Sequence, residues 1–92
     1  MKSIAEFKRK MIVGSQWVFV SSWSPKPITR TCTISQSNSF ALTSVRNPGE
    51  NSWCDWPKAK EVTFVKTPGE VTKVRIEPEG MPDVWLTYTP IE

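Results

Sequence analysis

The sequence contains no histidine, and this absence bears first on catalysis. Histidine is the side chain that most often acts as a general base near neutral pH. The chain also lacks a glycine-rich phosphate loop and a serine-nucleophile elbow. Asp55 follows Cys54 directly, but a neighbouring carboxylate disfavours the thiolate, and adjacent side chains on an extended segment point to opposite faces. We therefore predict that the protein is not an enzyme and uses no cofactor.

Cysteine is also scarce, because Cys32 and Cys54 are the only two and no Cys-x-x-Cys pair occurs. A structural zinc site takes about four cysteine or histidine ligands, so we predict no metal site. A disulfide between the two cysteines would require that they lie on neighbouring strands. The alternative, which we favour, is a pair of buried free thiols in a reducing cytoplasm.

Long apolar runs are missing as well. Nothing approaches the ~20 consecutive apolar residues that a transmembrane helix needs. Residues 11–13 follow three basic residues, as in a signal peptide, but Gly14 begins a polar interruption and no small-residue cleavage site follows. We therefore predict neither a membrane span nor a targeting segment.

What is present indicates one small, turn-rich domain over residues 1–92. Hydrophobic residues make up 38% of the chain and aromatic residues 11%, which is enough for a packed core. The eight prolines favour β structure with many turns. Charge is uneven: residues 1–46 carry a net charge of +6, whereas residues 47–92 carry −3. Such asymmetry suits a partner that is steered electrostatically, although a solvated surface would explain it equally well.

The segment 3–12 predicts a short N-terminal helix that packs on the rest of the domain. Ser3 and Glu6 have capping-box spacing, and basic residues fill the last turn, where they suit the negative end of the helix dipole. A helix of two to three turns cannot stand alone, so its apolar stripe must be buried. The residues of that stripe are Ile4, Phe7 and Met11.

Residues 16–90 predict an antiparallel barrel or sandwich of six or seven strands. The run 16–23 carries β-branched and aromatic residues on both parities, so we expect a buried strand with Trp17 in the core. Residues 28–36 alternate between apolar and threonine-rich faces. Strand signals continue at 8–12-residue spacing, separated by proline and glycine turns. The fold class is therefore mainly β (α+β); an SH3-like barrel is our first expectation and an OB-like barrel the second.

A tryptophan motif at residues 52–58 stands between the two halves of this pattern. Trp53 and Trp56 have opposite parity on an extended segment, so one ring is expected to face outward. Tryptophan buries 150–250 Å² in general, so a core role is the alternative for each ring. For Trp23 and Trp85, two roles are left open: each ring either covers the core or contacts a partner.

Several of these motifs together resemble small phage- or prophage-encoded proteins of unknown function. The resemblance implies a bacterial cytoplasm and a viral accessory role, including action against a host defence system. It supplies no functional residues. The motifs that carry it are Ala5-Glu6-Phe7-Lys8-Arg9-Lys10, Val13-Gly14, Trp17, Ser52-Trp53 and Trp56-Pro57-Lys58-Ala59.

We expect a non-catalytic binding protein that occludes a host macromolecule, either a protein or a protein–nucleic acid complex. The alternatives are a small barrel that binds single-stranded nucleic acid, through a cationic groove with ring platforms, and a protein that sequesters a small nucleotide signal. A homo-oligomer is left open, and no membrane partner is expected. The predicted contact residues are Trp23, Lys26, Arg30, Arg46, Trp53, Trp56, Lys58 and Trp85.

Overall fold

The structure is a computed structural model that describes residues 3–23, 25–46, 49, 51–69 and 71–91. Within these residues one short helix precedes a sheet of seven strands, so the predicted mainly-β class with an N-terminal helix is confirmed. The elements are α1 (Ile4–Lys10), β1 (Gln16–Ser21), β2 (Ile28–Ser35), β3 (Ser39–Ser44), β4 (Asn51–Asp55), the 3₁₀ helix η1 (Ala59–Glu61), β5 (Val62–Lys66), β6 (Thr72–Ile76) and β7 (Leu86–Pro90).

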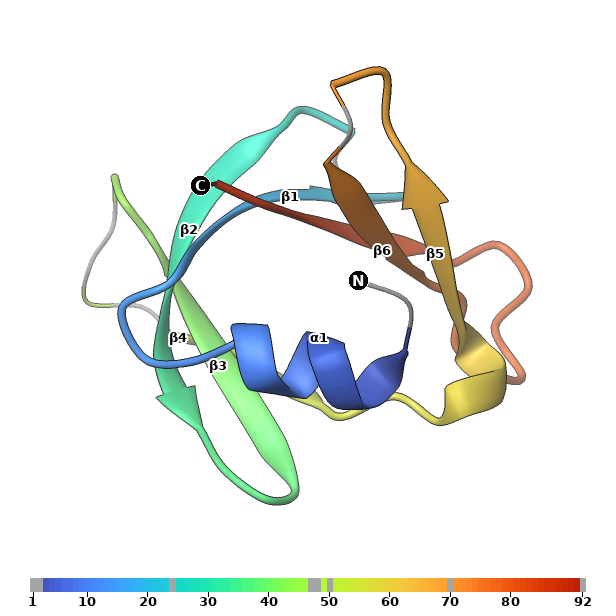
Figure 1. Cartoon of the computed structure of the whole chain (residues 1–92), viewed down its shortest axis with the longest axis horizontal. Helices are drawn as coiled ribbons and strands as arrows, with labels where there is room; N and C mark the ends of the chain where they lie inside the picture. The colour runs from blue at the N-terminus through green and yellow to red at the C-terminus, as the bar shows by residue number, and fades with distance from the viewer. Residues whose placement is uncertain (1–2, 24, 47–48, 50, 70, 92) are drawn as a thin grey trace.

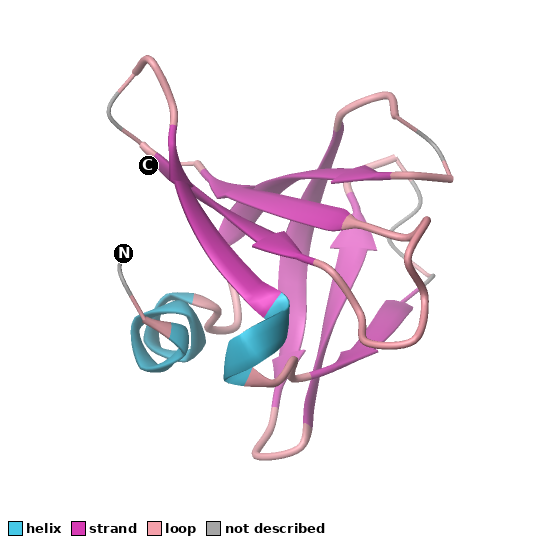
Figure 2. Ribbon diagram, turned by 90° about the vertical axis from the view of Figure 1, so that its right-hand side faces the viewer, coloured by secondary structure: helices cyan, strands magenta, loops and turns pink. Residues whose placement is uncertain are grey.

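The sheet is antiparallel throughout and has the order β4-β3-β2-β1-β7-β6-β5. Pairing of β1 with β7, in which Phe19 lies opposite Tyr88, joins the first half of the chain to its last strand. The sheet curves around the interior, and α1 lies in front of it between β3 and β5 (Figures 1 and 2). Since β4 and β5 are the two edges of the sheet, the barrel is not closed.

The helix begins where the sequence predicts and ends slightly earlier than residue 12. The backbone N–H of Glu6 donates to the Ser3 hydroxyl at 3.3 Å, which caps the first turn. Of the predicted apolar stripe, Phe7 and Met11 are fully buried and Ile4 is half-buried. After the helix, Gly14 adopts a φ of 95°, and its N–H donates to the Cys32 carbonyl at 2.9 Å. This left-handed turn, which glycine adopts readily, leads the chain into β1.

The core is built largely from aromatic rings that surround Phe7. The Phe7 ring packs edge-to-face against Trp17, Phe40 and Trp56, with centroids 5.7–6.0 Å apart. Trp17 is 1% exposed, as expected for the first strand. Edge-to-face pairs of this kind add about 0.5–1.5 kcal/mol each beyond the area they bury.

The main departure from the predicted strands concerns the end of β1. The strand was expected to reach residue 23 but ends at Ser21, so Trp23 lies outside the sheet. The downstream prolines Pro25 and Pro27 cannot take a place in a central strand, and they are exposed. Within the described part of the chain, no helix is both long and apolar enough to cross a membrane.

Candidate functional site: the mouth of the open barrel

Three of the predicted contact residues, Trp23, Arg30 and Trp53, meet at one cavity. Its volume is about 360 Å³, and it lies among β1, β2, β4 and β7. Because side chains alternate along a strand, the inward residues of these four strands converge here. We call this cavity the barrel mouth. It is lined by Phe19, Ser21, Trp23, Arg30, Ser52, Trp53, Cys54, Leu86 and Tyr88.

Arg30 is the only charged side chain among the residues that line the barrel mouth. It pairs with Trp17 in the register between β1 and β2, on the inward face of the sheet. The centre of its guanidinium lies 4.3 Å from the centroid of the Phe19 ring, within cation–π range. Its Nε atom is buried and has no hydrogen-bond partner among the described residues. The mouth therefore holds a cation with unused donor capacity.

Cys54 and Tyr88 form the polar pair of the mouth. Burial raises the pKa of the half-buried Cys54 thiol, and the nearby carboxylates of Asp55 and Glu61 raise it further. Burial also raises the pKa of Tyr88 well above its ordinary value, and a hydrogen bond to Cys54 adds to the effect. Both groups therefore stay protonated at neutral pH. Both cysteines are free, as in the alternative that we favoured, but Cys32 is buried whereas Cys54 is only half-buried.

The two tryptophans at the mouth are exposed for different local reasons. Trp23 is 71% exposed because it follows the end of β1 in an irregular segment. Trp53 is 56% exposed because it has the parity opposite to Ser52 and Cys54, whose side chains lie on the inward face of β4. The outward orientation predicted for one ring of the tryptophan motif is therefore confirmed for Trp53.

Strand β4 is an edge strand, and side-chain hydrogen bonds hold it in place. The Asn51 Oδ1 atom accepts hydrogen bonds from the hydroxyls of Thr33 and Thr43 at 2.8 and 2.6 Å. These bonds join β4 to β2 and β3 on the outward face of the sheet. They hold the rim of the mouth in place without using side chains of the core.

Lys26 and Arg46 lie in a separate groove next to the mouth. The groove has a volume of about 880 Å³ and runs between the start of β2 and the end of β3. Ile28 and Thr29 line it, and Arg30 follows them directly on β2, so the groove and the mouth adjoin along this strand. Both cations are exposed. We call this second cavity the Lys26–Arg46 groove.

Trp56 and Trp85 do not line the mouth. Trp56 packs on Phe40 with ring centroids 4.4 Å apart, and its indole N–H donates to the Gln36 carbonyl at 2.7 Å, so it is half-buried against the core. Trp85 is half-buried, and the Arg75 guanidinium lies 5.0 Å from its ring centroid. The structure thus separates these two rings from the predicted contact set.

Lys58 is also placed elsewhere, because it belongs to a structural cluster around η1. Glu61 accepts hydrogen bonds from the backbone N–H groups of Lys58 at 2.8 Å and Glu79 at 2.7 Å. These two bonds hold the pKa of the Glu61 carboxyl below its usual value. The ammonium groups of Lys58 and Lys60 lie 3.6 and 2.9 Å from the Glu79 carboxylate. The role of Glu61 in this turn was not predicted from the sequence.

Sequence reasoning also missed Phe19, Ser21, Cys54 and Tyr88 as parts of the mouth. Alternation along a strand indicates which side chains face inward, but no local pattern shows which inward residues lie at an open end of the barrel. Among the described residues, no group of three or more His, Cys, Asp or Glu side chains is placed to hold a metal ion.

Comparisons with protein-family models, with curated proteins and with solved structures found no match. The resemblance to phage-encoded proteins and the SH3-like or OB-like assignment therefore stay predictions. The barrel mouth has to be interpreted from its own chemistry.

Proposed function

We propose that this chain is a non-catalytic binding protein that captures single-stranded nucleic acid at the barrel mouth. The observation that carries the proposal is the Arg30 guanidinium, stacked on Phe19 with a buried Nε that lacks an acceptor among the described residues. Leaving a buried donor unpaired is costly. An anionic oxygen that enters the mouth would supply the acceptor, and a guanidinium binds phosphate oxygens especially well.

The rings and the neighbouring cations support a nucleic-acid ligand. Trp23 and Trp53 border the mouth and are exposed, and Trp53 faces outward at the free edge of the sheet, so their indoles offer surfaces beside the mouth on which bases can stack. The Lys26–Arg46 groove is lined by Ile28 and Thr29, which directly precede Arg30 of the mouth on β2. A strand that places one base at the mouth could therefore lay its phosphates along this groove.

The protonation state of the mouth supports binding rather than catalysis. The Cys54 thiol and the Tyr88 hydroxyl both have raised pKa values. Neither provides the anion that nucleophilic or general-base catalysis would need at neutral pH. Together with the absence of histidine from the sequence, this favours a site that holds its ligand unchanged.

The proposal includes a biological setting. A phage accessory protein in the cytoplasm of a bacterial host could act against host defence by covering nucleic acid, or a protein–nucleic acid complex, that the host uses. An SH3-like small barrel, or an OB-like one, would suit such a role, since partly open barrels bind oligonucleotides.

The proposal is tested by fluorescence anisotropy with a labelled random DNA oligonucleotide. Arg30→Lys keeps the charge but removes the planar guanidinium, and we expect it to weaken binding about tenfold. Trp53→Ala should weaken binding by about 5- to 100-fold, since stacking contributes roughly 1–3 kcal/mol per base. The melting temperature of the Trp53 variant should stay nearly unchanged because the ring is exposed. Affinity should fall steeply with salt.

The matched control is Lys66→Gln, which removes an exposed cation from β5, away from both the mouth and the Lys26–Arg46 groove. This variant should bind like the parent protein. Absence of binding at about 50 mM salt, where phosphate contacts are strong, would rule the proposal out. Equal losses in all three variants would rule out the site.

A small nucleotide is the second candidate ligand, because the mouth has a volume of about 360 Å³, within the range of small-molecule pockets. Competition separates the two. If a mononucleotide displaces the oligonucleotide at a similar concentration, the mouth binds a single nucleotide and the rest of the oligonucleotide adds nothing to the affinity. If much higher mononucleotide concentrations are needed, the neighbouring groove contributes to binding.

A further inference from the structure

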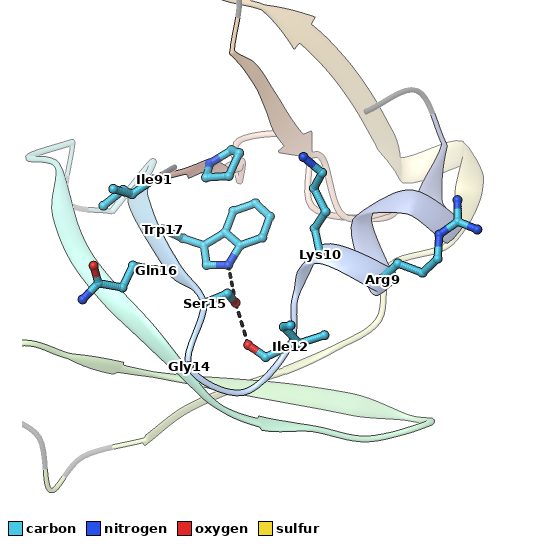
Figure 3. A pocket seen from close by; sticks show the side chains of 9 residues that line it. Arg9, Lys10, Ile12, Gly14, Ser15, Gln16, Trp17 and Ile91 are labelled. Carbon is cyan, nitrogen blue, oxygen red and sulfur yellow. Dashed lines mark hydrogen bonds between the residues drawn. The ribbon is translucent and has the colours of Figure 1, made fainter.

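A third cavity lies at the opposite end of β1 from Trp23, between the end of α1 and the end of β7. Its volume is about 480 Å³, and we call it the helix cleft (Figure 3). Trp17 lies at its base: the indole N–H donates to the Ser15 hydroxyl at 2.9 Å, and that hydroxyl donates to the Ile12 carbonyl at 2.6 Å. The residues that line the helix cleft are Arg9, Lys10, Ile12, Gly14, Ser15, Gln16, Trp17, Pro90 and Ile91.

The rim of the helix cleft combines exposed aliphatic side chains with positive charge. Ile12 is 57% exposed and Ile91 is 43% exposed. The N–H of Ile91 donates to the Gln16 carbonyl at 2.9 Å, which holds Ile91 beside the start of β1. A group of large aliphatic side chains exposed on a small protein often marks an interaction surface.

The charged side chains among the described residues that line the helix cleft are both basic. They are Arg9 and Lys10, and both are exposed. In Figure 3 the Lys10 side chain extends past the Trp17 indole, whereas Arg9 extends along the outer side of the helix. The charge therefore borders the apolar surface without filling it.

We propose that the helix cleft docks an acidic, aliphatic-rich segment of a partner protein. Acidic side chains would complement Arg9 and Lys10, and leucine-like side chains would cover Ile12 and Ile91. Nucleic acid fits this surface poorly, because the one indole here is 1% exposed and offers no stacking face. The helix cleft shares no lining residue with the barrel mouth and only Gln16 with the Lys26–Arg46 groove among the described residues, so this inference is argued from other side chains than the proposed nucleic-acid function.

The test is a titration of the isotopically labelled protein, followed by amide and indole N–H resonances. The probe is a synthetic peptide in which glutamate alternates with leucine, and the comparison peptide has lysine in place of glutamate. We expect the glutamate peptide to shift the Trp17 indole N–H and the amides of Gly14 and Ile91. The lysine peptide should shift none of them.

Variants locate the contact. Ile12→Ser and Arg9→Glu should each weaken binding of the glutamate peptide about tenfold or more. The matched controls are Val45→Ser, which removes an aliphatic residue that is also 57% exposed but lies in the Lys26–Arg46 groove, and Lys66→Glu on β5. Both controls should bind the peptide like the parent protein.

Four outcomes would overturn the inference: no shifts with the glutamate peptide, equal shifts with both peptides, shifts of the cleft resonances by an oligonucleotide, or self-association through the cleft. Self-association would show as concentration-dependent shifts of the same resonances without any peptide. The nucleic-acid proposal is tested separately, because Trp53→Ala should leave peptide binding intact. Loss of either function alone therefore identifies which proposal fails.

Discussion

The tryptophan rings of this protein differ in what they contact, and strand parity accounts for much of the difference. Trp17 faces inward on β1, whereas Trp53 faces outward on β4. Trp56 follows β4 and turns back onto Phe40 and Phe7. A side chain of the same type thus serves as core in one place and as exposed surface in another, depending on the register of its strand.

Replacing the buried Trp17 with alanine should destabilise the protein much more than replacing the exposed Trp23. The indole is fully buried, packs on Phe7 and donates its N–H to Ser15. We expect Trp17→Ala to lower the free energy of unfolding by about 3–5 kcal/mol, which is a large part of the total for a domain of this size. Urea denaturation measures the loss. Trp23→Ala is the control and should cost little, because that ring is exposed. A Trp17 variant as stable as the control would contradict the placement of Trp17 in the core.

At the scale of elements, α1 closes the front of the open barrel. Its buried residues Phe7 and Met11 belong to the main core cluster, so the helix and the sheet share one core. A helix of seven residues has little stability of its own. Its cap and its packing together must hold it in place.

Removing the N-cap should therefore destabilise the whole domain. Ser3→Ala deletes the acceptor of the Glu6 N–H, and we expect a loss of about 1 kcal/mol in the free energy of unfolding. Thermal or urea unfolding measures it. Ser3→Asp, which keeps an acceptor at the cap and suits the positive end of the helix dipole, should be close to the parent protein. An equal loss in both variants would show that the cap contributes nothing.

At the scale of the molecule, the open barrel presents two surfaces of different chemistry. The barrel mouth offers rings around a guanidinium, and the helix cleft offers aliphatic side chains bordered by cations. Their cations come from residues 1–46, the part of the sequence with the positive net charge. If both proposals hold, the protein could contact the nucleic acid and the protein of one complex at the same time.

Burial of the Tyr88 hydroxyl predicts how stability depends on pH at the alkaline end. The pKa of Tyr88 is raised well above 10.0 in the folded protein, so the unfolded chain loses this proton at a lower pH. The contribution to stability is therefore complete below about pH 10, the ordinary tyrosine value, and is lost as the pH rises above it. The free energy of unfolding, measured by urea denaturation at increasing pH, should fall less steeply for Tyr88→Phe. Identical slopes would contradict the burial of the hydroxyl.

Local patterns in the sequence predicted those features that depend on nearby residues. The helix cap at Ser3, the buried face of Phe7 and Met11, and the inward position of Trp17 follow from helical and strand periodicity. The opposite orientations of Trp53 and Trp56 follow from strand periodicity in the same way. These features need only the identity of residues a few positions apart.

The tertiary structure decided which distant residues share a surface. Trp23, Arg30 and Trp53 come from three separate segments, and only the pairing of β1 with β2 and the free edge at β4 bring them to one mouth. Lys58 approaches Glu79 only because η1 lies beside the turn before β7. Side-chain alternation is a property of each strand, whereas register and barrel closure depend on contacts between strands far apart in the chain. For that reason the sequence indicated the kinds of side chain involved, and the folded molecule determined which of them lie together.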